Sequence, residues 1–100
     1  METSIQELDG KLVAALSGEF DTAAALEAEQ ALSPLLEAEE QDIVIDCSKL
    51  EYIASSGLRI LLNIVKKAKS GGNKVVLKGV SDVIREVLEL TGFIKLFDFE

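Results

Sequence analysis

The chain has 100 residues, of which 48% are hydrophobic, and this length and composition are typical of one compact domain with a single core. It contains one cysteine, Cys47, and no histidine. These counts exclude an internal disulfide, a cysteine–histidine or serine–histidine catalytic pair, and the usual zinc ligand sets.

Charge is distributed unevenly along the chain, whose net charge is −8. Residues 1–50 contain 12 acidic and 2 basic residues (net −10), whereas residues 51–100 contain 6 and 8 (net +2). A negative field of this kind opposes a phosphate backbone, so we expect no nucleic-acid partner. The longest apolar runs are far shorter than the roughly 20 residues of a membrane span, and the N-terminus lacks the pattern of a secretory signal. We therefore expect one domain over residues 1–100 that is cytoplasmic and not inserted in a membrane.

The first two elements are expected to form a β-hairpin. The stretch SIQELDGKLVAAL contains two short runs joined by Asp9-Gly10, a dipeptide that supplies the positive φ angles of a tight two-residue turn. The composition then shifts to alanine, leucine and glutamate over residues 22–40, which predicts a helix. Pro34 lacks an amide donor, so we expect it to kink this helix or to restart it with Ser33 as the cap.

The middle of the chain predicts a buried strand followed by an amphipathic helix. QDIVID (41–46) is a β-branched run that resembles a strand buried on both faces, and Cys47 after it is expected to be a small side chain at the edge of the core. From Leu58 onward, apolar residues recur with helical spacing, and the helix should end at Gly71-Gly72.

The last third predicts a strand, a helix and an edge strand. NKVVLKGV (73–80) is a short strand, and Ser81 can cap a helix that ends at Gly92. IKLFDF (94–99) is a possible last edge strand. Helices that alternate with apolar strands indicate an α/β fold with a mixed, mostly parallel sheet, an N-terminal antiparallel hairpin, and helices after strands 2, 3 and 4.

Two adjacent hydroxyls, Ser55 and Ser56, precede Gly57 at the start of the second predicted helix. The free amides and the dipole at a helix start favour oxygen-rich groups. A serine there can simply cap the helix, and the residues alone favour this interpretation. A phosphoserine would interact more strongly, because it adds about −1.5 to −2 charges and three acceptor oxygens.

Two stretches of the chain resemble the STAS domain family, which takes its name from sulfate transporters and anti-sigma factor antagonists. DCSKLEYIASSGLRILL (Asp46 to Leu62) is similar to the family signature, in which Asp-Ser-Ser-Gly-Leu opens a helix, and GEFD (Gly18 to Asp21) is similar to the Gly-Glu-Leu-Asp turn before the first helix. The expected order of elements agrees along essentially the whole chain. The resemblance therefore implies a single STAS-like domain.

The resemblance to the small, stand-alone members of the family also implies a function. Such proteins are bacterial anti-sigma factor antagonists, which bind a serine-kinase anti-sigma factor and so release a sigma factor. Phosphorylation of the first serine of the motif ends this binding, and a phosphatase restores it. Carried onto this sequence, the phosphate acceptor is Ser55, with Ser56 as the second choice. The kinase partner uses ATP and magnesium, whereas this chain itself is expected to need no cofactor.

One departure from the motif is Ala54, which stands where the family usually has aspartate. The missing carboxylate removes a possible contact to a partner, and it also removes a negative neighbour, so a phosphate on Ser55 would meet less like-charge repulsion. The residues at the helix starts form the expected partner surface: Asp21, Thr22, Ser55, Ser56, Gly57, Leu58 and Arg59.

Alternatives remain open for several of these residues and for the function. For Asp21 and Thr22 the residues favour the N-cap of the first helix over a direct partner contact, and the two roles can coexist. Leu58 is expected in the core with Leu61 and Leu62. Some STAS domains serve as non-enzymatic subunits of transport systems, including lipid transport, and a small-molecule or nucleotide sensor is a third possibility. An enzyme is not expected, because no general base for a serine nucleophile can be identified.

Overall fold

The computed structural model describes residues 1–38 and 40–100, and it consists of one five-stranded sheet with helices. The strands follow the order β1-β2-β3-β4-β5 across the sheet; β1 is antiparallel to β2, and the other neighbours are parallel. This confirms the expected α/β class and the helices after strands 2, 3 and 4. The elements are β1 (Glu2–Leu8), β2 (Lys11–Phe20), α1 (Thr22–Ala31), α2 (Ser33–Glu37), β3 (Ile43–Ile53), α3 (Ser55–Ser70), β4 (Val75–Lys78), α4 (Asp82–Leu90), the 3₁₀ helix η1 (Phe93–Leu96) and β5 (Asp98–Phe99).

The N-terminal hairpin has the predicted turn. Asp9 and Gly10 have φ angles of 52° and 79°, and Leu8 pairs with Lys11 across the turn. Positive φ at both central residues matches the right-handed twist of the flanking strands, which is why this dipeptide joins them. The hairpin makes β1 an edge of the sheet.

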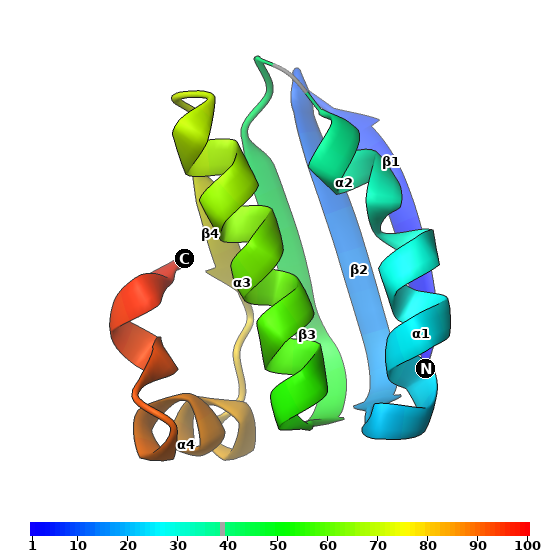
Figure 1. Ribbon diagram of the computed structural model, residues 1–100, viewed down its shortest axis with the longest axis vertical. Helices are drawn as coiled ribbons and strands as arrows, with labels where there is room; N and C mark the ends of the chain where they lie inside the picture. The colour runs from blue at the N-terminus through cyan, green and yellow to red at the C-terminus, as the bar shows by residue number, and fades with distance from the viewer. Residues whose placement is uncertain (39) are drawn as a thin grey trace.

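One face of the sheet carries the core, and α1, α2 and α3 all lie in front of it (Figure 1). Ile43 and Ile45 on β3, and Leu77 on β4, are at most 1% exposed. Val44, which lies between the two isoleucines, is only half-buried. The prediction that QDIVID is buried on both faces is therefore wrong. Strand β3 also continues beyond Asp46 to Ile53, because its pairing with β2 resumes after each of two register shifts.

The helical region 22–40 is divided as Pro34 predicts. Helix α1 ends at Ala31, and α2 begins at Ser33 with Pro34 in its first turn. The expected capping role of Ser33 is wrong: Leu32 is the N-cap, and the Ser33 hydroxyl donates to the carbonyl of Gln30 at 2.8 Å. Helix α2 ends at Glu37, so the helix does not reach residue 40; Glu39 lies outside the described residues.

The C-terminal third follows the expected order with one difference. Helix α3 ends at Ser70 with Gly71 as its C-cap, and the Ser81 hydroxyl caps α4 by accepting from the amide of Ile84 at 3.3 Å. The segment 94–99 is not one strand. Residues Phe93–Leu96 form η1 after the left-handed Gly92, and only Asp98–Phe99 pair with β4, as an edge strand.

Cys47 lies in the core, as expected, and is 1% exposed. Burial, with a smaller contribution from the negative charge of Asp46, raises the pKa of its thiol to about 12. Across residues 1–38 and 40–100, the structure contains no helix with the length and apolar character needed to cross a membrane.

Candidate functional site

The junction between β3 and α3 carries the two hydroxyls that the sequence singles out. Ala54 has an extended backbone (φ −87°, ψ 167°) and is the N-cap of α3. Its amide donates to the carbonyl of Phe20 at 2.9 Å, and its own carbonyl accepts from the amide of Leu58 at 3.0 Å. The start of α3 is thereby fixed to the end of β2. The Ala54 methyl has no acceptor atom, and among the described residues no side chain caps this helix.

The two serines have different environments. Ser55 is the first residue of α3 and is exposed, whereas Ser56 is half-buried and its hydroxyl donates to Thr22 Oγ1 at 3.4 Å. The interpretation of either serine as the cap of α3 is wrong, because the capping position belongs to Ala54. Ser55 is therefore the more accessible of the two hydroxyls.

The start of α1 lies beside the start of α3 and contributes Asp21 and Thr22 (Figure 1). Asp21 is the N-cap of α1, and its Oδ1 accepts from the amide of Ala24 at 2.9 Å. The capping role is confirmed for Asp21. It is not shared by Thr22, which is the exposed first residue of the helix. The hydroxyls of Thr22 and Ser56 join the two helix starts.

Gly57 and Leu58 lie beneath the surface. A Cβ atom on Gly57 would approach the Phe20 ring to 2.9 Å and Ile53 Cγ1 to 3.0 Å, so only glycine fits here without movement. Leu58 is 0% exposed, which confirms its expected place in the core. Both residues are buried in this structure, because the amphipathic face of α3 turns Leu58 toward the sheet. Their contact with a partner stays a prediction. Arg59, the next residue, is exposed.

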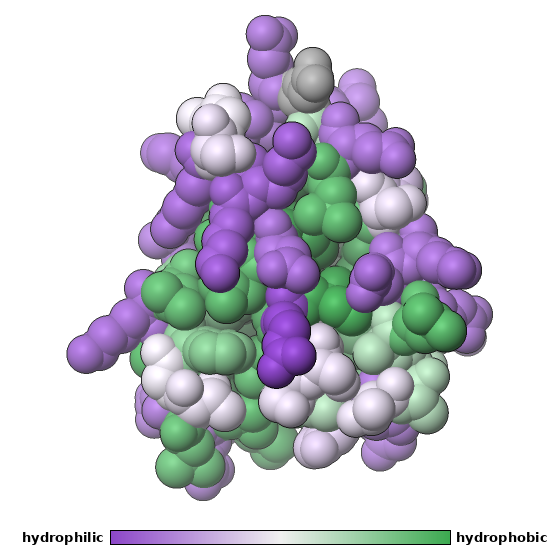
Figure 2. All heavy atoms as spheres, viewed as in Figure 1, coloured by the Kyte–Doolittle hydropathy of each residue, from purple (hydrophilic) through white to green (hydrophobic). Residues whose placement is uncertain are grey.

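A groove of about 330 Å³ runs between α1 and α3, next to the hydroxyls. Apolar surface comes from Ala25, Leu26 and Ile60, and polar groups come from residues that include Glu29, Arg59 and Asn63. Leu26 is 74% exposed, and with Ala25 it gives this part of the groove an apolar wall. In Figure 2, hydrophilic side chains run down the middle of the face formed by the helices, and apolar patches lie on either side of them.

The groove also includes three residues that are not in the predicted partner surface: Leu26, Glu29 and Asn63. The stretch TAAALEAEQA in α1 is rich in alanine, so its apolar residues do not define one face. The exposure of Leu26 follows from the rotation of α1 about its axis, which tertiary packing sets. Leu26 is the one large apolar residue within TAAALEAEQA, and this sequence feature is a signal that could have pointed to the groove.

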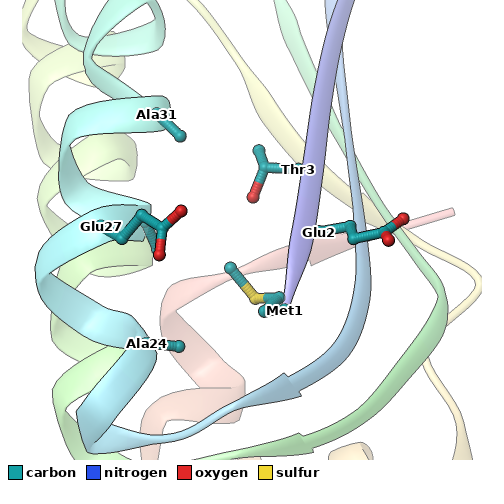
Figure 3. Close-up of a pocket in the computed structure, with 7 residues that line it drawn as sticks. Met1, Glu2, Thr3, Ala24, Glu27 and Ala31 are labelled. Atoms are coloured by element: carbon teal, nitrogen blue, oxygen red, sulfur yellow. The ribbon is translucent and has the colours of Figure 1, made fainter.

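A second cavity, of about 390 Å³, lies between α1 and the edge strand β1. In Figure 3, the side chains of Met1, Thr3 and Glu27 point into the space between the two elements, whereas Glu2 points away from it. No group of three or more cysteine, histidine, aspartate or glutamate residues that could hold a metal ion occurs in the part of the chain that the structure describes. This cavity contains none of the residues predicted for the site.

Comparison with known proteins connects this geometry to one family. The family model described as the STAS domain matches residues 2–100. BtrV of Bordetella bronchiseptica, which is assigned as an anti-sigma factor antagonist, is 33% identical over 97 residues, covering 97% of this chain and 84% of that protein. The intermembrane phospholipid transport system binding protein MlaB of Escherichia coli is 35% identical over 80 residues, covering 76% of this chain and 75% of that protein.

Solved structures also superimpose on this chain. An anti-sigma factor antagonist from Mycobacterium paratuberculosis is 33% identical and superimposes with a TM-score of 0.82, covering 98% of this chain and 83% of that chain. A Thermotoga maritima protein of the same fold has a TM-score of 0.85 at 20% identity, with 97% of this chain and 84% of that chain covered. The second similarity concerns the fold alone.

Proposed function

The chain belongs to the STAS domain family, and from this premise we propose that it is an anti-sigma factor antagonist regulated at Ser55. In this proposal the unmodified protein binds a serine-kinase anti-sigma factor in the cytoplasm, which releases a sigma factor, and the protein itself catalyses no reaction. The relatives assigned as antagonists support the general role. The observation that carries the choice of residue is the exposed hydroxyl of Ser55 at the start of α3.

The switch we propose is a phosphoryl transfer from the partner's ATP. Ser55 Oγ forms a bond to the γ-phosphorus, the bond from that phosphorus to the bridging oxygen breaks, ADP leaves, and the hydroxyl proton passes to a base of the kinase. A phosphatase reverses the state by transferring the phosphoryl group to water. A dianion at a packed interface weakens it, because the charge must be desolvated and repels acidic neighbours.

Incubation with candidate kinase anti-sigma factors and ATP, followed by mass spectrometry, tests this proposal. We expect one added phosphate, mapped to Ser55, in the wild-type protein and in Ser56→Ala. Ser55→Ala should acquire none. A phosphate that persists in Ser55→Ala, or that maps to Ser56, would reject Ser55 as the acceptor. The Ser55→Glu variant should bind the same kinase more weakly than the wild type, and unchanged affinity would reject the electrostatic switch.

A second candidate function is an accessory subunit of a transport system. Two observations favour it: the similarity to MlaB, and Ala54 in place of the aspartate that the antagonist motif usually carries. The two functions predict different partners. A pulldown with the tagged protein should recover an ATP-binding kinase if the first is correct, and a transporter ATPase if the second is correct.

A further inference from the structure

Arg59 lies one helical turn after Ser55 on α3, and both side chains are exposed. Residues four apart on a helix lie on the same face, with their Cβ atoms about 6 Å apart. Arg59 also lines the groove between α1 and α3, together with Ser56 and Thr22, whose hydroxyls are 3.4 Å apart. The i,i+4 spacing therefore places the Arg59 guanidinium within reach of a group on the Ser55 side chain. Ser55 itself is not among the residues that line the groove, so Arg59 is the residue that links the two.

The order of the two residues favours an ion pair once Ser55 carries a phosphate. An acidic group four residues before a basic group is the more stabilising orientation on a helix, because each charge then lies closer to the favourable end of the helix dipole. A guanidinium also presents a planar pair of donors that match two phosphate oxygens. Arg59 is therefore suited to hold a phosphate in a fixed position.

Other charges around Arg59 act on this contact. Glu29 lines the opposite wall of the groove on α1, and Asp21 caps α1 next to Thr22. Both carboxylates repel a phosphate on Ser55, and Glu29 can attract the Arg59 guanidinium. Asp21 already accepts from the amide of Ala24, whereas position 54 contributes no carboxylate. The strongest anion within one turn of Arg59 on its own helix would be the phosphate itself.

From this arrangement, and resting on the proposed function, we propose that Arg59 binds the phosphate of phosphorylated Ser55. The phosphate draws the guanidinium toward the start of α3 and away from Glu29. Phosphorylation then changes the partner surface in two ways, because it adds negative charge at the helix start and removes a positive group from the groove. Arg59 thus transmits the effect of phosphorylation at Ser55 to the groove between α1 and α3.

The contact is tested by titrating the phosphate in ³¹P NMR on protein that carries phosphoserine at position 55 through chemical or genetic incorporation. A nearby guanidinium stabilises the dianion, so it lowers the second pKa of the phosphate. We expect the wild-type midpoint to lie about 0.3 pH units or more below that of Arg59→Gln. The matched control is Lys66→Gln, which removes one positive charge from the same helix. Eleven residues separate it from Ser55, about 16 Å along the axis, so its midpoint should equal that of the wild type.

Equal midpoints in wild type and Arg59→Gln would overturn the proposal, and so would equal shifts in Arg59→Gln and Lys66→Gln. Circular dichroism verifies that the variants fold, and Arg59→Ala serves as a second variant with the same expected shift. Because the phosphoserine is installed without a kinase, this outcome is independent of the phosphorylation experiment. Failure of a kinase to modify Ser55 would reject the proposed function, whereas equal midpoints would reject only the contact with Arg59.

Discussion

At the scale of single residues, the region around Ser55 depends on two small side chains. Ala54 occupies the capping position without a capping atom, and Gly57 occupies a space too small for a methyl group. At each position, a substitution that adds only a few atoms should change the free energy of unfolding. Both can therefore be tested by minimal substitutions.

Ala54→Asp should stabilise the protein. Ala54 already has the extended backbone of an N-cap, and an aspartate there can accept from the free amides of the first turn. We expect the free energy of unfolding to rise by about 0.5 to 2 kcal/mol, which raises the melting temperature by several degrees. Ala54→Asn, which caps without charge, should give much of the same gain in calorimetry. No gain in either variant would contradict the absence of a cap in the wild type.

Gly57→Ala should destabilise the protein. The added methyl would lie 2.9 Å from the ring of Phe20, which is fully buried and has little room to move. Overpacking of this kind costs about 1 to 3 kcal/mol, measurable by chemical denaturation. Gly71→Ala is the matched control, since its φ is −92° and the nearest atom is 3.5 Å away; it should change stability by less than about 0.5 kcal/mol. Equal effects at both glycines would reject the packing argument.

At the scale of elements, two helix starts lie side by side but are built differently. Helix α1 has a side-chain cap in Asp21, and α4 has one in Ser81, whereas α3 begins at an alanine. The exposed Ser55 hydroxyl is therefore free of the structural role that the sequence alone favoured for it. This separates a residue needed for folding from one available for modification.

The pair Asp21→Ala and Ser55→Ala measures this difference. Asp21→Ala removes the hydrogen bond to the amide of Ala24 and should lower the free energy of unfolding by about 1 kcal/mol. Ser55→Ala removes an exposed hydroxyl and should change it by less than about 0.5 kcal/mol. Thermal unfolding of both variants measures these two changes in the free energy of unfolding. A loss in Ser55→Ala as large as that in Asp21→Ala would restore a capping role to Ser55.

At the scale of the whole molecule, one sheet face and the helices that cover it form a single core, with Cys47 among its buried residues. A thiol in this position reports on unfolding. Burial raises its pKa to about 12, so very little thiolate exists in the folded protein at pH 8. In the unfolded chain the pKa returns toward its ordinary value near 9.

Cys47 should therefore react with a thiol reagent only when the molecule opens. We expect the native protein to be almost unreactive at pH 8, and the guanidinium-unfolded protein to react rapidly. Because the folded pKa is raised, the protonated thiol contributes stability below the unfolded pKa, and this contribution is lost as pH rises above it. The absorbance of the thiolate that the reagent releases measures the reaction. Rapid reaction of the native protein would contradict the burial of Cys47.

The sequence determined the features that local chemistry encodes. The Asp9-Gly10 turn, the break at Pro34 and the glycine end of α3 depend on residues a few positions apart, and the hydroxyl motif is contiguous. Together with the alternation of apolar strands and helices, these features predicted the α/β class. The resemblance of the hydroxyl motif to a known family then pointed to the candidate site. The sequence also overestimated the extent of local elements, since 94–99 forms a 3₁₀ helix before a short strand.

Only the tertiary structure decided which of the site residues reach the surface. Helical spacing placed Leu58 in the core but could not decide between Ser55 and Ser56. The Ser56 hydroxyl donates to Thr22, 34 residues earlier in the chain, and only the packing of α1 beside α3 creates this contact. The groove with Leu26 exists only where α1 and α3 pack side by side. The physical reason is that turns and caps depend on neighbours along the chain, whereas burial depends on how distant elements are rotated against one another.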